Sequence, residues 1–234
     1  KVIACQNVFA IHRAATLQDF HANAAWPYFD TFNVHCYEQL QGYPKAFADY
    51  RDVSAGKPMW VTEISVRVKW EGDEQLKELS EEDLRLQGER VTKTYALALH
   101  QGAATVFYFI LSQYSEGQVQ YGLLHADFTP RPGYLALAAV GRLLADAKPL
   151  GRLALPDKAG QAYFFDAKPD GQAADVMVVW AQRETAFELP KAPKACYDHL
   201  GRSRPVPGKV LKAGPTPLYA VLARDARPAL TPPP

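Results

Sequence analysis

The sequence has few cysteines and no excess of charge of either sign. Its three cysteines, Cys5, Cys36 and Cys196, lie in unrelated contexts without C-x-x-C spacing. This pattern indicates neither a disulfide framework nor a zinc site, so each is expected to be a small buried apolar side chain. The 26 Lys and Arg residues nearly balance the 25 Asp and Glu residues, giving a net charge of +1. Without a basic face or block, the sequence predicts no nucleic-acid partner.

Long apolar runs and metal-binding patterns are also missing. No stretch approaches the ~18 apolar residues of a membrane span, so no membrane insertion is expected. The N-terminal residues lack the basic, apolar and small-residue regions of a signal peptide. None of the six histidines has a spacing typical of metal ligands, so we expect neither a metal nor a cofactor. A length of 234 residues suffices for one or two domains with a sizeable core.

One apolar stretch, residues 57–65, contains a single carboxylate. Its sequence K-P-M-W-V-T-E-I-S places Glu63 near the end of a run that contains Trp60 and Ile64. Strands covered on both faces become nearly continuous apolar runs, so the stretch predicts a strand buried on both sides. A carboxylate there is costly to bury unless it is paired or used in chemistry. Either Glu63 is a salt-bridged strand end, or it is the centre of a site.

Strands and helices alternate over the first 149 residues. Apolar runs near 2–10, 29–37, 57–65 and 105–111 predict strands, the last one fully apolar, and the segments 44–53, 80–101 and 133–148 predict helices. Ser80 followed by Asp83 is a capping box at the start of the second helix. Such alternation is typical of βα units on a parallel sheet, and we expect four of them in an α/β fold.

The pattern changes near residue 150. Short strand-like runs follow one another without helical periodicity, at 162–165, 175–180, 186–189, 195–197, 209–211 and 218–222. Regular short strands with turn residues between them predict an antiparallel β-sandwich. We therefore expect a half β/α barrel over 1–149, a β-sandwich domain over 150–226, and a Pro-rich, disordered tail over 227–234.

The order of these elements resembles a known family. N-V-H-C-Y ends the second strand at Tyr37, Glu63 ends the third, and a Y-G-L-L passage from Tyr121 leads to T-P-R-P-G-Y at Tyr134. This order resembles the C-terminal half of a retaining clan-A glycoside hydrolase, of the family 39-like or family 5-like β/α barrels with an appended β-sandwich. No single motif is specific, but their order covers nearly the whole chain.

The resemblance implies a site and a substrate class. It implies that Glu63 is the nucleophile, with a glycoside or oligosaccharide as substrate and with no cofactor. Tyr37 would hydrogen-bond Glu63, and His35 would contact the substrate or the same network; both would otherwise be a satisfied core pair. The aromatic side chains expected to stack on a sugar ring are Trp70, Phe107 and Phe109. Such a substrate would suit a secreted or periplasmic protein.

The sequence departs from the family in what it lacks. The family's acid/base is a Glu after Asn on the fourth barrel strand, and this chain has no Asn-Glu pair. Four βα units cannot close an eight-stranded barrel. The missing half could come from another chain or from a second copy in a homo-oligomer, or the protein is a non-catalytic carbohydrate-binding or scaffold relative. The carboxylates in loops that could replace the acid are Glu38, Glu71, Glu116 and Asp127.

Overall fold

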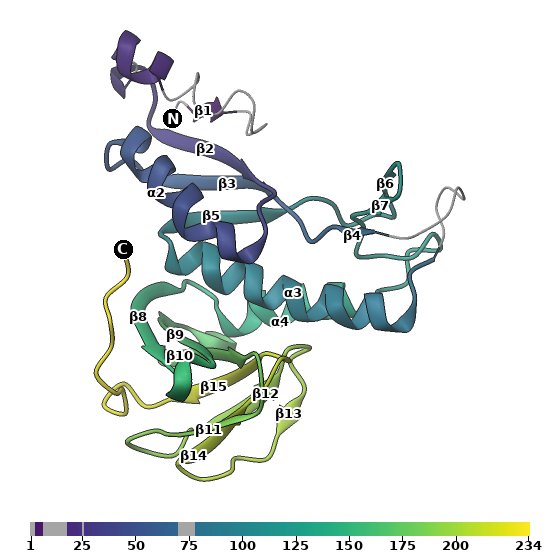
Figure 1. Cartoon of the computed structure of the whole chain (residues 1–234), viewed down its shortest axis with the longest axis vertical. Helices are drawn as coiled ribbons and strands as arrows, with labels where there is room; N and C mark the ends of the chain where they lie inside the picture. The colour runs from purple at the N-terminus through teal and green to yellow at the C-terminus, as the bar shows by residue number, and fades with distance from the viewer. Residues whose placement is uncertain (1–2, 7–17, 25, 70–77) are drawn as a thin grey trace.

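The computed structural model describes residues 3–6, 18–24, 26–69 and 78–234, and shows a mixed α/β fold (Figure 1). Its first sheet is parallel throughout, with strand order β1-β2-β3-β5. The strands are β1 (Ile3–Gln6), β2 (Thr31–Cys36), β3 (Met59–Ile64) and β5 (Ala103–Tyr108). The predicted alternation is confirmed, because α2 (Tyr43–Ser54), α3 (Glu81–His100) and α4 (Pro132–Leu143) follow the last three strands in turn. Residues 2 and 7–10 of the first predicted strand lie outside the described residues.

The start and end of α3 follow from local chemistry. Ser80 caps the helix, since its Oγ accepts a hydrogen bond from the Asp83 backbone N at 3.1 Å. The acidic first turn suits the positive end of the helix dipole. The chain then turns at Gly102, whose φ of +96° favours glycine. The capping box predicted at Ser80 is confirmed.

The third helix is shorter than predicted. We expected it to reach residue 148, but α4 ends at Leu143, and strand β8 (Lys148–Ala154) begins where the helix was expected to end. Pro149 cannot continue a helix because it has no backbone N–H and its ring clashes with the preceding turn. Neither Pro149 nor Gly151 is typical of a strand interior, so the sequence pattern missed β8 altogether.

The antiparallel part of the chain contains two sheets. The six-stranded sheet has the order β13-β12-β15-β10-β9-β8, and a separate pair joins β11 to β14. Every strand predicted after residue 160 is present. The bounds are β9 (Gly160–Ala167), β10 (Ala174–Ala181), β11 (Thr185–Glu188), β12 (Ala195–Asp198), β13 (Ser203–Arg204), β14 (Val210–Ala213) and β15 (Leu218–Leu222).

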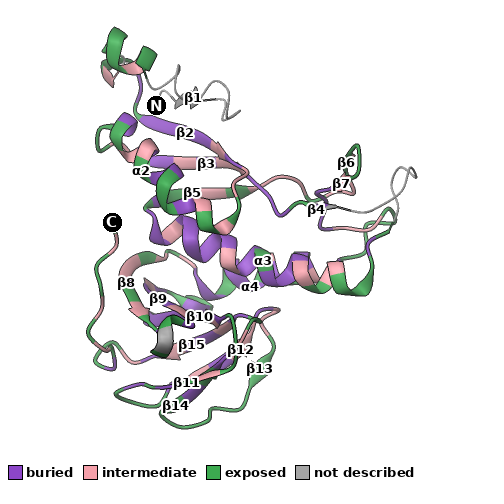
Figure 2. Cartoon of the chain, in the orientation of Figure 1, coloured by how far each residue is buried: buried purple, intermediate pink, exposed green. Residues whose placement is uncertain are grey.

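Helices α3 and α4 lie between the parallel sheet and the six-stranded sheet (Figure 1). Many residues along the two helices are buried (Figure 2). One core cluster runs through all three layers and includes Val61, Tyr95 and Phe165. A second cluster, with Phe164 and Phe187, lies between the six-stranded sheet and the β11–β14 pair. Neighbouring residues 164 and 165 serve different cores because successive strand side chains point to opposite faces.

The expectation that β3 and β5 are buried on both faces is wrong. Along β3, Met59 and Val61 are buried, whereas Trp60 and Glu63 are only partly so. On β5, Phe107 is 48% exposed. Helices cover only one face of this sheet in the described part of the chain, so apolar side chains on the other face remain accessible (Figure 2).

The expectation of a disordered tail is also wrong. Arg227 forms an ion pair with buried Asp175, from Nε to Oδ2 at 2.8 Å. Further along, Thr231 exchanges backbone hydrogen bonds with Arg152 of β8. The tail therefore lies against the six-stranded sheet, where the ion pair compensates a carboxylate that would be costly to bury alone.

A small three-stranded sheet stands at the carboxyl ends of the parallel strands. It contains β4 (Val68–Lys69), β6 (Ser115–Glu116) and β7 (Val119–Gln120), in the order β4-β7-β6. In Figure 1 it projects beyond the sheet on the side to which β2, β3 and β5 point. Within the described part of the chain, none of the helices combines the length and apolar content needed to cross a bilayer.

Acidic pH is expected to destabilise the fold through His100. This side chain is 2% exposed, and burial, assisted by the charges of Arg152 and Arg51, lowers its pKa from 6.5 to about 4. Between these two values the unfolded chain binds a proton that the folded chain does not, so the free energy of unfolding falls as the pH decreases. The expected loss is on the order of 2 kcal/mol.

Urea unfolding at pH 7 and pH 4.5 measures this effect. His100→Gln should lose part of the pH dependence, whereas His21→Gln, at an exposed position, should retain all of it. An unchanged pH dependence in His100→Gln would contradict the assignment.

Candidate active site

An irregular register in β3 places Glu63. Val34 of β2 pairs with Val61, but the next pair joins His35 to Glu63, so Thr62 is an extra residue between them. A bulge of this kind turns successive side chains to one face. Thr62 and Glu63 are accordingly both partly exposed, and Ile64 returns to the core with 0% exposure.

The Glu63 carboxylate has two partners from the end of β2 and the residues that follow it. The Tyr37 hydroxyl donates a hydrogen bond to Oε2 at 2.5 Å, and His35 Nδ1 lies 3.1 Å from the same oxygen. Among the described residues, no partner contacts Oε1. The side chain of Glu63 is 30% exposed. The structure thus brings His35, Tyr37 and Glu63 together as predicted, with one carboxylate oxygen held and the other accessible.

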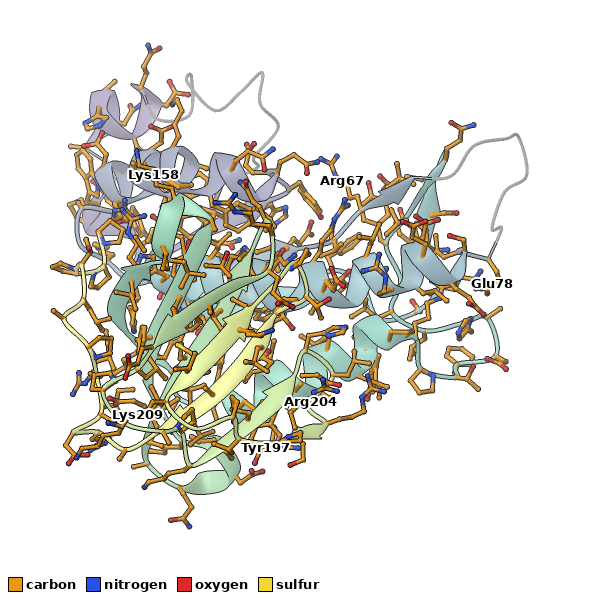
Figure 3. The ribbon with its side chains drawn as sticks, turned by 60° about the horizontal axis from the view of Figure 1, so that its bottom comes forward. Arg67, Glu78, Lys158, Tyr197, Arg204 and Lys209 are labelled. Atoms are coloured by element: carbon orange, nitrogen blue, oxygen red, sulfur yellow. The ribbon has the colours of Figure 1, made fainter. Side chains whose placement is uncertain are left out.

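Tyr37 is fixed as a hydrogen-bond donor. Burial, then its hydrogen bond to Glu63 and that carboxylate's charge, raise the pKa of Tyr37 above its usual range, so the phenol remains protonated. Arg67 donates from a guanidinium nitrogen to the Tyr37 backbone oxygen at 3.0 Å and holds the residue from the other side. Figure 3 labels Arg67 on the segment that leaves β3.

Aromatic side chains lie at the same end of the parallel sheet as the Glu63 carboxylate. The ring of Phe109 contacts those of Tyr114 and Tyr121 edge-on. Both tyrosines donate to Glu116, at 2.7 Å from Tyr114 and 3.3 Å from Tyr121. Phe107 lies on the uncovered face of β5. Of the predicted stacking residues, Phe107 and Phe109 are therefore placed near the site, and Trp70 lies outside the described residues.

Sequence reasoning missed Arg67, Tyr114 and Tyr121. Tyr121 opens the Y-G-L-L passage, which was a usable signal, but nothing around Arg67 or Tyr114 distinguishes them from ordinary loop residues. These residues lie close together because β4, in the segment after β3, pairs with β7, in the segment after β5.

The loop carboxylates have different surroundings. Asp127 Oδ1 accepts hydrogen bonds from Thr129 Oγ1 at 2.6 Å and Thr129 N at 3.0 Å, which lower the pKa of the carboxyl and suit it poorly to donate a proton. Glu116 is held by the two tyrosines. Glu38 lines a small cleft that also includes Tyr37, and Glu71 lies outside the described residues. No group of three His, Cys, Asp or Glu side chains able to hold a metal ion occurs in the ranges that the structure describes.

A buried arginine anchors the passage from Tyr121 to Tyr134. Arg131 is 0% exposed and donates to the Gly122 backbone oxygen at 3.0 Å. Its other guanidinium nitrogen lies 2.9 Å from Glu78 Oε2, and His125 contacts the same oxygen at 3.0 Å. The arginine of the T-P-R-P-G-Y sequence therefore fixes the loop that carries the aromatic wall.

The fold and the site lead to one class of proteins. Residues 6–119 match a family model described as "Glycosyl hydrolase catalytic core". Over these residues, which are just under half of the chain, the resemblance to glycoside hydrolases is confirmed. No curated protein matches the chain.

Solved structures refine the comparison. A family 39 glycoside hydrolase from the gut symbiont Bacteroides cellulosilyticus WH2 aligns with a TM-score of 0.64 at 20% identity, covering 90% of this chain and 48% of that one. SrfJ from Salmonella typhimurium aligns with a TM-score of 0.53 at 11% identity, covering 92% of this chain and 45% of that one. At these identities the likeness shows the fold alone, and the chain spans about half the length of the solved structures it matches.

Proposed function

We propose that this chain is the nucleophile-bearing half of a retaining glycoside hydrolase, with Glu63 as the nucleophile. The observation that carries the proposal is the Glu63 carboxylate at the carboxyl end of a parallel strand, held through Oε2 by His35 and Tyr37 with Oε1 accessible. Catalytic residues of β/α barrels lie at this end of the strands. The match to a glycosyl hydrolase catalytic core supports the same reading.

The proposed architecture is half of a β/α barrel followed by a β-sandwich. β1 and β5 are the outer strands of the parallel sheet. Beside β5 lies a cleft of about 790 Å³ whose lining includes Ala103, Val106, Val140 and Leu144. A barrel needs further strands at both edges. We propose that the other half of the barrel, as a further segment or a separate chain, occupies these edges and supplies the acid/base.

The chemistry assigns a role to each residue. Glu63 Oε1 would attack the anomeric carbon and form a glycosyl ester, while the leaving oxygen takes a proton from the acid/base, ~5 to 5.5 Å from the nucleophile in such enzymes. Tyr37 keeps the carboxylate oriented through Oε2, and His35 contacts the same oxygen. Water then hydrolyses the ester. Phe107 and Phe109 offer apolar faces to the sugar ring.

Covalent trapping tests the nucleophile directly. 2,4-Dinitrophenyl 2-deoxy-2-fluoro glycosides have a leaving group that needs no proton, so they do not depend on the acid/base. Incubation of the chain with the xyloside, glucoside, galactoside and mannoside should add one fluoroglycosyl group, seen by intact mass and mapped to Glu63 in a peptide digest. Absence of label with all four sugars, or label on another residue, would count against Glu63.

The second candidate function is a non-catalytic carbohydrate-binding or scaffold protein derived from such an enzyme. It predicts that oligosaccharides bind without turnover and that the fluoroglycosides leave Glu63 unmodified. The trapping experiment therefore separates the two candidates.

Tyr37→Phe is expected to slow the formation of the glycosyl ester. The change removes a hydrogen bond to a charged oxygen, worth about 1.5 to 3 kcal/mol, or roughly 10- to 100-fold in rate. Release of dinitrophenolate, followed by absorbance, measures the rate. Tyr134→Phe is the control, because Tyr134 is a partly exposed tyrosine on α4; an equal loss in both variants would contradict the role of Tyr37.

A further inference from the structure

A second cleft, of about 550 Å³, adjoins the Glu63 site. We call it the arginine cleft, after Arg67 and Arg90. Helix α3 lines one side with Asp83, Leu86 and Arg90, and the segments after β2 and β3 line the other with Gln39, Arg67 and Val68. A smaller cleft of about 30 Å³ shares Gln39, Arg67 and Arg90 with it and includes Tyr37, which donates to Glu63. The two clefts are therefore continuous, and Tyr37 connects them to the Glu63 site.

Among the described residues, no ion pair neutralises the positive charges of the arginine cleft. Within that part of the chain, the Arg90 side chain forms neither an ion pair nor a hydrogen bond, and Arg67 forms no ion pair. The hydrogen bond from Arg67 to the Tyr37 backbone oxygen holds that guanidinium in place without neutralising it. Two carboxylates belong to the described lining. Glu38 lines the smaller cleft, and Asp83 Oδ2, in the larger one, accepts a hydrogen bond from Ser80 Oγ at 2.8 Å as part of the helix cap. Two guanidinium groups therefore face a concave space without a carboxylate bound to either.

The shape of the cleft suits a sugar as well as an anion. Leu86, which is partly exposed beside the buried Val68, gives it apolar surface of the kind that contacts the C–H face of a sugar ring, and Gln39 adds an amide that can hydrogen-bond hydroxyl groups. Guanidinium groups bind carboxylate and sulfate through pairs of parallel hydrogen bonds. An ordinary solvated arginine on a convex helix face would have neither feature beside it.

We propose that the arginine cleft is a subsite for an acidic saccharide, in which Arg90 and Arg67 bind a carboxylate or sulfate group on a sugar next to the one that reacts at Glu63. As a subsite of that reaction, it rests on the proposed function. The binding itself does not require turnover.

Paired acidic and neutral ligands test the proposal. The probes are the methyl glycosides of glucuronic, galacturonic and mannuronic acid, each beside the neutral sugar of the same configuration, and the 6-sulfated forms of the neutral sugars. Ligand-observed NMR titrations at low ionic strength give Kd values without turnover, and low salt limits screening of the charges. At least one acidic sugar should bind about tenfold more tightly than its neutral counterpart. A preference shown by the uronates but not the sulfated sugars identifies carboxylate as the ligand, and the reverse identifies sulfate.

A matched pair of variants locates the effect. Arg90→Gln should remove most of the preference for the acidic sugar while leaving the neutral sugar's Kd unchanged. Arg204→Gln is the control, since Arg204 is exposed on β13, and Figure 3 shows it in the antiparallel part of the molecule, apart from Arg67. Equal binding of acidic and neutral sugars, or loss of the preference in Arg204→Gln as well, would overturn the subsite. If the preference is present while the fluoroglycosides fail to label Glu63, the proposed function fails and the acidic-saccharide site remains.

Discussion

Glu63→Gln is expected to reduce the release of dinitrophenolate from an activated aryl glycoside by about 10⁴-fold or more, corresponding to about 5 kcal/mol of transition-state stabilisation. The amide preserves the size of the side chain, and it can still meet Tyr37 and His35, but it is a far weaker nucleophile than a carboxylate. The fold should survive, because the side chain is 30% exposed and is not part of the core. Circular dichroism and thermal unfolding of the variant check this point.

Two controls make the result specific to Glu63. Glu81→Gln removes an exposed carboxylate from the first turn of α3 and should keep the wild-type rate. Added azide can take over the nucleophile's role, so it should restore turnover in a variant that lacks the carboxylate and yield a glycosyl azide of inverted configuration. Unchanged turnover in Glu63→Gln would rule out Glu63 as the nucleophile.

Arg131→Met is expected to have the largest effect on stability among these predictions. The substitution fills similar space with an apolar chain, but it leaves the Gly122 oxygen with one donor, Gln87 Nε2 at 3.1 Å, in place of two. It also ends the contact with Glu78, whose side chain is 49% exposed and can be hydrated instead. The expected loss is about 2 to 4 kcal/mol, from the two charge-assisted interactions that the buried guanidinium makes with Gly122 and Glu78.

Chemical and thermal unfolding measure this loss. A Tm decrease of roughly 5 to 15 °C is expected for a chain of this size. Arg204→Met, at an exposed position, should change the free energy of unfolding by less than about 0.5 kcal/mol. If both variants unfold alike, Arg131 does not anchor the loop. Arg131→Lys should recover only part of the loss, because an ammonium lacks the guanidinium fork that contacts Gly122 and Glu78 together.

Much of the fold could be predicted because its signals are local. The cap at Ser80, the turn at Gly102 and the apolar periodicity of α2 and α3 depend on residues a few positions apart, and the structure has them as predicted. The strands after residue 160 were predicted for the same reason, except the two-residue β13. Prediction failed where distant segments decide the outcome. β8 is a strand because β9 pairs with it, and the tail is ordered because Asp175 and Arg152 bind it.

The candidate site divides in the same way. The pattern of types along the chain pointed to Glu63, since a carboxylate that ends an apolar run is costly unless it has partners. The resemblance to clan-A glycoside hydrolases pointed to His35 and Tyr37. The contributions of Arg67 and Tyr114 were not predictable, because each reaches the site from a loop whose path depends on how β4, β6 and β7 pair. Arg90 gave no signal, since an arginine on a helix surface is ordinary until a cleft is seen beside it.

By itself, the sequence determined which strand would carry the carboxylate and which neighbouring strand would supply its partners. Only the tertiary structure decided how the carboxylate is presented. The extra residue Thr62 shifts the register so that Glu63 pairs with His35, and both partners contact Oε2. The physical reason is that strand register is set by hydrogen bonds and side-chain packing between segments far apart in the chain, and a shift of one residue moves a side chain from the core to the accessible face.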